Sequence, residues 1–174
     1  MRASCLLLRP GEGIAFRRRL EMISSGIGEA HLEPMELMLP QRSEGLSNLL
    51  KSLDQSVRSV DPRCAIVTAG PFLPAYLAVI SLTEVWNIPT ILDLRDPWLT
   101  NPYTTHGLKG LLARTPFKAV ERLAMRSATA VSVCSDGLAN YARHRGARHV
   151  HRIYTGAHLG EHLAGVSSAL LSIC

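Results

Sequence analysis

The sequence predicts an α/β protein, specifically a Rossmann-like three-layer domain with a mainly parallel sheet. Short apolar runs of strand length alternate with longer segments of helical spacing, an order typical of right-handed β-α-β crossovers. One run, CAIVTAGP from Cys64 to Pro71, is almost wholly apolar and closes with Gly-Pro, as in a central strand buried on both faces. Aromatic residues make up only 5% of the chain and hydrophobic residues 47%, which suits an aliphatic sheet core covered by helices.

The first half of the chain supplies three of the expected strands. SCLLLRP is short and apolar, and HLEPMELMLP contains Pro34, which lacks a backbone donor and so belongs at an edge or bulge. Leucines at helical spacing follow the candidate N-cap Ser43 and end before Asp61-Pro62. The expected elements are a strand at 4–10, a turn at Gly11 and Gly13, a helix at 14–25, an edge strand at 31–40, a helix at 45–57 and a central strand at 64–71.

The second half continues the alternation. The segment 73–86 is apolar almost all round, which predicts a helix buried against the sheet. Thr115-Pro116 resembles a helix start, a cap followed by proline at the first position, and Ser135 is a second candidate cap. The expected elements are a helix at 73–86, a strand at 89–98, a long loop at 101–115, a helix from 116, a strand at 128–135, a helix from 136 and a short strand at 151–156.

The formal charge is +5 with a pI near 9.3, which favours anionic partners such as phosphates, nucleotide sugars or acidic lipid headgroups. Two basic clusters carry this charge, Arg17–Arg19 and Arg143–Arg152, and solvated helix faces explain them equally well. Nucleic-acid binding is not expected, because the clusters lack interleaved aromatics and zinc-finger spacing.

The cysteines are widely scattered and show no CxxC spacing, which predicts buried thiols of a cytoplasmic protein rather than a disulfide framework. No apolar run approaches membrane-span length, so we expect at most peripheral contact with the inner face of a membrane. We expect no metal site, since the H-x-x-E-H spacing of His158–His162 contains Gly160 and lacks a third ligand.

The strongest functional signal is PTILDLRDPW, an apolar strand that ends in Asp93, Arg95 and Asp96. Charges at a strand end are costly to bury unless they pair or meet a ligand, and α/β proteins bind ligands at the carboxyl edge of the sheet. Arg95 has the planar fork that holds a phosphate or sugar hydroxyls, and either aspartate can orient it. An internal Asp–Arg pair that only fixes the following loop is the alternative.

The order of charged strand end, helix ERLAMRSA, strand ATAVSVCS and helix start SDGLANYARHRG resembles the N-terminal domain of family 4 retaining glycosyltransferases. RIYTGAH is similar to the family's Asn-Gly-Val-Asp hinge, with Thr155 in place of the asparagine. The resemblance implies the N-terminal half of a GT-B fold over residues 1–157, followed by a short tail at 158–174.

This resemblance also implies a function: the acceptor-side domain of an enzyme that moves a sugar from a nucleotide-sugar donor to a glycan or lipid-linked acceptor. It implies no further cofactor. The implied acceptor-binding residues are Asp93, Arg95, Asp96, His106, Gly70 and Ser135. Gly11 and Gly13 match the family's Gly-rich turn and form a weaker donor-phosphate candidate, for which an ordinary turn is the alternative.

The family's second domain carries a Glu-x7-Glu signature, and no such spacing follows Gly156. The resemblance therefore predicts a chain that is inactive alone and relies on a separate donor-binding domain or chain. Two alternatives remain open: a non-catalytic subunit of a two-chain glycosyltransferase, and an unrelated Rossmann-like nucleotide-binding module. The module alternative predicts a longer Gly-rich fingerprint than this chain contains.

Overall fold

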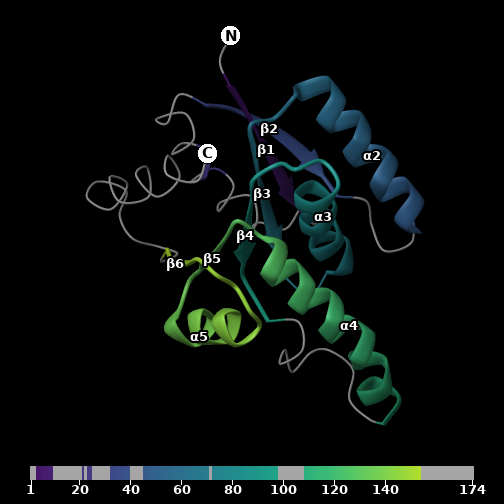
Figure 1. Ribbon diagram of the computed structural model, residues 1–174, viewed down its shortest axis with the longest axis vertical. Coiled ribbons are helices and arrows are strands. Elements are labelled where there is room, and N and C mark those ends of the chain that lie inside the picture. Colours follow the sequence, from purple (N-terminus) through teal and green to yellow (C-terminus); the bar gives the residue numbers. More distant parts are fainter. Residues whose placement is uncertain are drawn as a thin grey trace.

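The computed structural model describes residues 3–9, 21, 23–24, 32–39, 45–70, 72–97 and 108–153, which assemble around one sheet (Figure 1). The elements in chain order are β1 (Ala3–Arg9), β2 (Leu32–Met38), α2 (Gly45–Val60), β3 (Cys64–Ala69), α3 (Leu73–Glu84), β4 (Thr90–Leu94), α4 (Leu108–Ser127), β5 (Ala130–Val133), α5 (Asp136–His144) and β6 (Val150–Arg152).

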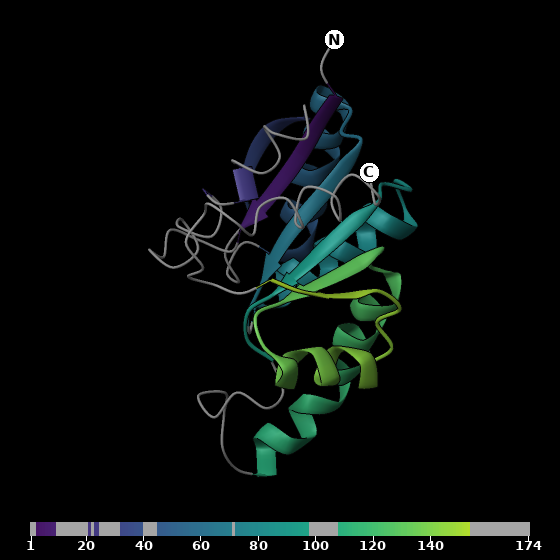
Figure 2. The same ribbon diagram turned by 90° about the vertical axis from the view of Figure 1, so that its left-hand side faces the viewer.

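The sheet has six strands in the order β2-β1-β3-β4-β5-β6, and every neighbouring pair is parallel. Figure 2 shows the strands side by side in one twisted layer. β3, the predicted central strand, lies between β1 and β4 and is buried at every residue. β2, which contains Pro34, is an edge strand as predicted. The strand order reverses between β1 and β3, so the topological switch point lies there.

Helices α2, α3, α4 and α5 all contribute to one large apolar core, which they form with one face of the sheet. The second face carries a smaller cluster, with Cys5 and Cys64 facing each other across β1 and β3. Ile23, one of the helical residues described between β1 and β2, packs against this second cluster. The sheet is therefore covered on both faces, and the predicted Rossmann-like three-layer α/β class is confirmed.

The segment around Pro116 differs from the prediction. The sequence suggests a loop over 101–115 with a helix beginning at Pro116, but α4 begins at Leu108 and contains Pro116 in its interior. Leucines at 108, 111 and 112 continue the helical period upstream of the proline. A helix of this length can tolerate the loss of the one backbone hydrogen bond that proline cannot donate. The cap-then-proline pattern is therefore a false start signal here.

Several predicted features lie outside the described residues: the turn at Gly11 and Gly13, His106, the hinge at 154–157 and the tail at 158–174. The division of the chain into 1–157 and 158–174 thus stays a prediction. Among the described cysteines, Cys5 and Cys64 are buried and Cys134 is half-buried, and none of the three forms a disulfide. No helix in the described part of the chain is both long and apolar enough to span a bilayer.

Candidate functional site

Polar side chains interrupt the apolar sequence of three neighbouring strands near their carboxyl ends. Thr68 of β3 is the register partner of Asp93 in β4, and Asp93 is the partner of Ser132 in β5. His151 of β6 continues the same line beside Ser132. Register partners in a parallel sheet project to the same face, so these four residues form one row, here called the carboxyl-edge row.

The row lies on the second face of the sheet. Cys64 and Ile66 precede Thr68 at every second position in β3, Ile91 precedes Asp93, and all three belong to the smaller apolar cluster. The helices α2–α5 cover the opposite face. The row therefore borders an apolar floor at the carboxyl edge, where parallel α/β sheets place ligands.

Asp93 is the charged centre of the row. Its residue is only 1% exposed, and its Oδ1 accepts a hydrogen bond of 2.5 Å from the Ser132 hydroxyl. Ser132 is 5% exposed, so the pair is removed from bulk water. A buried carboxylate needs such donors because its desolvation is otherwise uncompensated. Asp93, a site residue predicted from the sequence, is thus held in place by a hydrogen bond from the next strand.

Two buried donors at this edge, one from β3 and one just after β4, lack hydrogen-bond partners among the described residues. Thr68 is 1% exposed, and its hydroxyl has no hydrogen-bond partner among the described residues. The same holds for Nη1 of Arg95, a buried atom of a half-buried side chain. The Arg95 backbone N–H donates to the Ala69 carbonyl at 2.9 Å, so the β3–β4 ladder continues and alternation places Arg95 on the face of Asp93.

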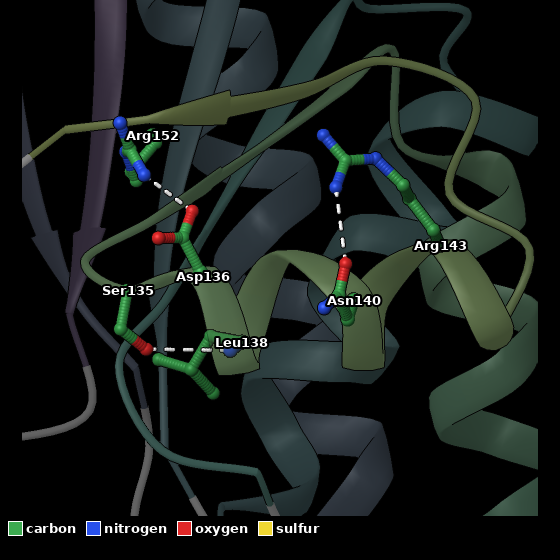
Figure 3. Close-up of polar contacts among 6 residues, drawn as sticks. All are labelled: Ser135, Asp136, Leu138, Asn140, Arg143 and Arg152. Carbon is green, nitrogen blue, oxygen red and sulfur yellow. Dashed lines mark hydrogen bonds and ion pairs between the residues drawn. The ribbon is translucent and has the colours of Figure 1, made fainter.

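The remaining predicted site residues are placed differently. Asp96 is exposed, and alternation sends it to the opposite face, where its charge affects Tyr76. Gly70 is buried directly after β3, and its carbonyl accepts from Phe72 N–H at 2.7 Å. Ser135 caps α5 by accepting from Leu138 N–H at 3.3 Å (Figure 3), a structural role. Asp93 and Arg95 therefore share one face of the sheet, and Ser135 is the N-cap of α5.

Thr68 and Ser132 are not among the site residues predicted from the sequence. A signal for both was present, because each is a lone hydroxyl residue within an apolar strand run, CAIVTA and AVSV. A single polar residue buried in a strand needs a partner, and the neighbouring strands are where it finds one. The register that joins them to Asp93 depends on the strand order, which the sequence alone did not specify.

A second buried polar cluster joins the helices on the opposite face. Glu121 of α4 is fully buried and accepts a 2.7 Å hydrogen bond from the Tyr141 hydroxyl of α5. Arg145 approaches the same carboxylate at 3.8 Å, with its guanidinium 5.0 Å from the centre of the Tyr141 ring. Burial above all, then the nearby charge of Glu121, raises the pKa of Tyr76 well above its ordinary value near 10. The contacts of Glu121 with Tyr141 and Arg145 join α4 to α5 and the turn that follows it.

The described residues contain no group of three or more histidine, cysteine, aspartate or glutamate side chains arranged to hold a metal ion. Ion pairs elsewhere on the described surface are peripheral. Arg152 of β6 pairs with Asp136 at the start of α5 (Figure 3), and Arg58 pairs with Asp54 along α2 at 2.8 Å. Such exposed pairs contribute little to stability.

No family model and no curated protein matches this chain. Among solved structures, the chain is similar to Est1E from Butyrivibrio proteoclasticus, an esterase, with a TM-score of 0.55. The sequence identity is 12%, and the match covers 98% of this chain and 86% of that one. At this identity the similarity concerns the fold.

The predicted membership of the glycosyltransferases is wrong. Est1E, a solved structure that the chain matches, is an esterase and not a glycosyltransferase, and no family model supports the resemblance. A charged strand end followed by a helix, a strand and a capped helix describes many parallel α/β sheets, because all of them place polar groups at the carboxyl edge. The comparisons therefore establish an α/β fold shared with Est1E, and the site has to be interpreted from its own chemistry.

Proposed function

We propose that this chain is a small-molecule-binding α/β domain whose ligand carries an anionic group and a hydroxyl. The binding site is the carboxyl edge of β3, β4 and β5, around Thr68, Asp93 and Arg95. The observation that carries this proposal is a pair of buried donors, the Thr68 hydroxyl and Nη1 of Arg95, for which the described residues supply no acceptor.

Burial of those two donors has a free-energy cost when no ligand is bound. A buried donor without an acceptor costs on the order of 1–3 kcal/mol, and more when it is charged. Both donors lie on one face of the sheet, Thr68 as the register partner of the buried Asp93, and their cost falls at the edge where this fold class binds ligands. A ligand that supplies acceptors to both donors removes that cost when it binds.

The donors and acceptors also restrict the ligand. The guanidinium of Arg95 binds the oxygens of a phosphate or carboxylate through its planar fork, and Thr68 donates one further hydrogen bond. Asp93 has the opposite preference, because a carboxylate accepts from hydroxyl groups and repels anions. A ligand with an anionic end near Arg95 and a hydroxyl near Asp93 satisfies both.

Ester hydrolysis like that of a serine esterase is not favoured by this geometry. Asp93, Ser132 and His151 do lie in one row, but the serine stands between the acid and the histidine. Its hydroxyl donates directly to Asp93, whereas a nucleophilic serine needs a histidine to accept its proton. Ser132 also lies within β5 instead of at an exposed strand-to-helix turn.

Thermal unfolding with inorganic phosphate and with glycerol 3-phosphate tests the proposal. Both probes are expected to raise the unfolding temperature, glycerol 3-phosphate more strongly because it adds hydroxyls. Arg95→Gln is expected to weaken phosphate binding by about tenfold or more, since it removes a charge-assisted contact. Arg58→Gln, at an exposed side chain of α2, is the matched control and should leave binding unchanged.

Three results would overturn the proposal. The first is the absence of stabilisation by either probe, and the second is equal stabilisation of the wild type and Arg95→Gln. The third is turnover of p-nitrophenyl acetate that Ser132→Ala abolishes, because this would assign Ser132 as a nucleophile. Sodium chloride at matched ionic strength controls for general screening.

A further inference from the structure

A strongly basic surface lies away from the carboxyl-edge row, on α4 and the turn between α5 and β6. Lys118, Arg122 and Arg126 are exposed and recur at every fourth position of α4, so they form one stripe along its outer side. A Cβ atom built on Gly146 would stand 2.8 Å from Cγ of Arg126, which shows that the stripe ends against the α5–β6 turn. The α5–β6 turn therefore lies at the carboxyl end of the stripe.

Two further exposed cations stand near this turn in sequence but outside the stripe. Arg143 in the last turn of α5 contacts only the Asn140 amide oxygen, at 3.4 Å, among the interactions drawn in Figure 3. Arg148 is exposed just before β6. We call the stripe and the α5–β6 turn that it meets the α4–α5 basic surface, and its charged members on α4 are Lys118, Arg122 and Arg126.

Little negative charge opposes it. Glu121, the one acidic residue of α4, is fully buried beneath Tyr141 and Arg145. Glu84 at the end of α3 is exposed and accepts from the Ser127 hydroxyl at 2.7 Å. The three exposed cations of the stripe thus have one exposed carboxylate near them from α3 and α4, that of Glu84.

Large apolar side chains stand exposed among these charges. Leu123 of α4, between Arg122 and Arg126 in sequence, is 49% exposed. Val85, next to Glu84 and therefore beside the last turn of α4, is 70% exposed. Exposed apolar residues surrounded by cations are typical of surfaces that rest in the interface of an anionic membrane, where the apolar groups enter the headgroup region.

We propose that the α4–α5 basic surface binds the surface of an anionic lipid membrane. Single-stranded nucleic acid fits less well, because its binding sites need free aromatic rings for stacking. Tyr141, the aromatic residue of α5, is covered by Arg145 and hydrogen bonded to Glu121. The surface lies where α4 ends before β5 begins, at the amino edge of the sheet, so a membrane there leaves the carboxyl-edge row accessible.

Vesicle sedimentation with the full chain tests this inference. Binding is expected to phosphatidylcholine vesicles that contain about 30% phosphatidylglycerol, and not to pure phosphatidylcholine. The double variant Arg122→Gln/Arg126→Gln should bind about 25-fold more weakly, about fivefold for each cation removed. The matching Arg122→Lys/Arg126→Lys variant should retain binding, because it keeps both charges. Leu123→Ser should weaken binding at unchanged charge.

Arg58→Gln on α2 serves as the control and should bind like the wild type. Circular dichroism establishes that each variant is folded. Equal sedimentation with neutral vesicles, no sedimentation with either kind, or binding that the double glutamine variant retains would overturn the proposal. Binding of single-stranded RNA together with failure to bind the anionic vesicles would also overturn it and assign the surface to nucleic acid.

Discussion

Replacement of Glu121 by alanine is expected to lower the free energy of unfolding by about 3 kcal/mol, the largest loss among the changes considered. The substitution removes the acceptor of the Tyr141 hydroxyl and the partner of Arg145, whose side chain is only 23% exposed. It also leaves a cavity between α4 and α5 at a residue with no exposed surface. The loss therefore combines an unpaired donor, a half-buried cation and lost packing.

Urea unfolding of Glu121→Ala and Glu121→Gln separates these contributions. Glutamine keeps an acceptor oxygen and nearly the same volume, so its expected loss is about 1 kcal/mol. If Glu121→Ala lowered the free energy of unfolding by less than Glu121→Gln does, the account would be contradicted. That result would mean that the buried carboxylate destabilises the protein. Tyr141→Phe should be less damaging in the Glu121→Ala background than in the wild type, since the hydroxyl has already lost its acceptor.

Replacement of Ser132 by alanine is expected to destabilise the protein by about 2 kcal/mol. The change leaves the carboxylate of Asp93, at 1% exposure, without the 2.5 Å hydrogen bond that it accepts. Hydrogen bonds to buried charges are stronger than neutral ones, and the remaining charge has no bulk water to replace the donor. Ser132→Thr keeps the hydroxyl and is the matched control.

A double-mutant cycle of Ser132→Ala with Asp93→Asn measures the coupling between the two side chains. The loss caused by Ser132→Ala should be smaller by at least about 1 kcal/mol in the Asp93→Asn background, because an amide is less costly to leave unsatisfied than a carboxylate. Additive losses would contradict a direct Asp93–Ser132 interaction. The cycle compares free energies of unfolding without ligand, so its result does not depend on which ligand the protein binds.

Most of the fold could be predicted because its signals are local. Continuous apolar runs predicted β3 and α3, and Pro34 predicted that β2 is an edge strand. Ser135 caps α5 as predicted. The failure at Pro116 has a physical reason, since proline is compatible both with a first turn and with a tolerated break inside α4. Local sequence does not decide between these two positions.

The candidate site was only half predictable. Charge at the end of β4 pointed to Asp93 and Arg95, but Thr68 and Ser132 entered through the register of neighbouring strands. Register depends on which strands pair, a long-range property that a lone hydroxyl residue does not reveal. The predicted glycosyltransferase activity failed for a related reason, because strand and helix order identifies a fold class and not a reaction.

The most direct test of a ligand site at the carboxyl edge is the unfolding temperature of Thr68→Val with and without glycerol 3-phosphate. Valine replaces a buried hydroxyl that lacks a partner by a methyl group of similar shape. We expect the free variant to be more stable than the wild type by about 1 kcal/mol and to gain less from the ligand. A less stable variant with an undiminished ligand response would contradict the account, because the hydroxyl would then serve the fold and not the ligand.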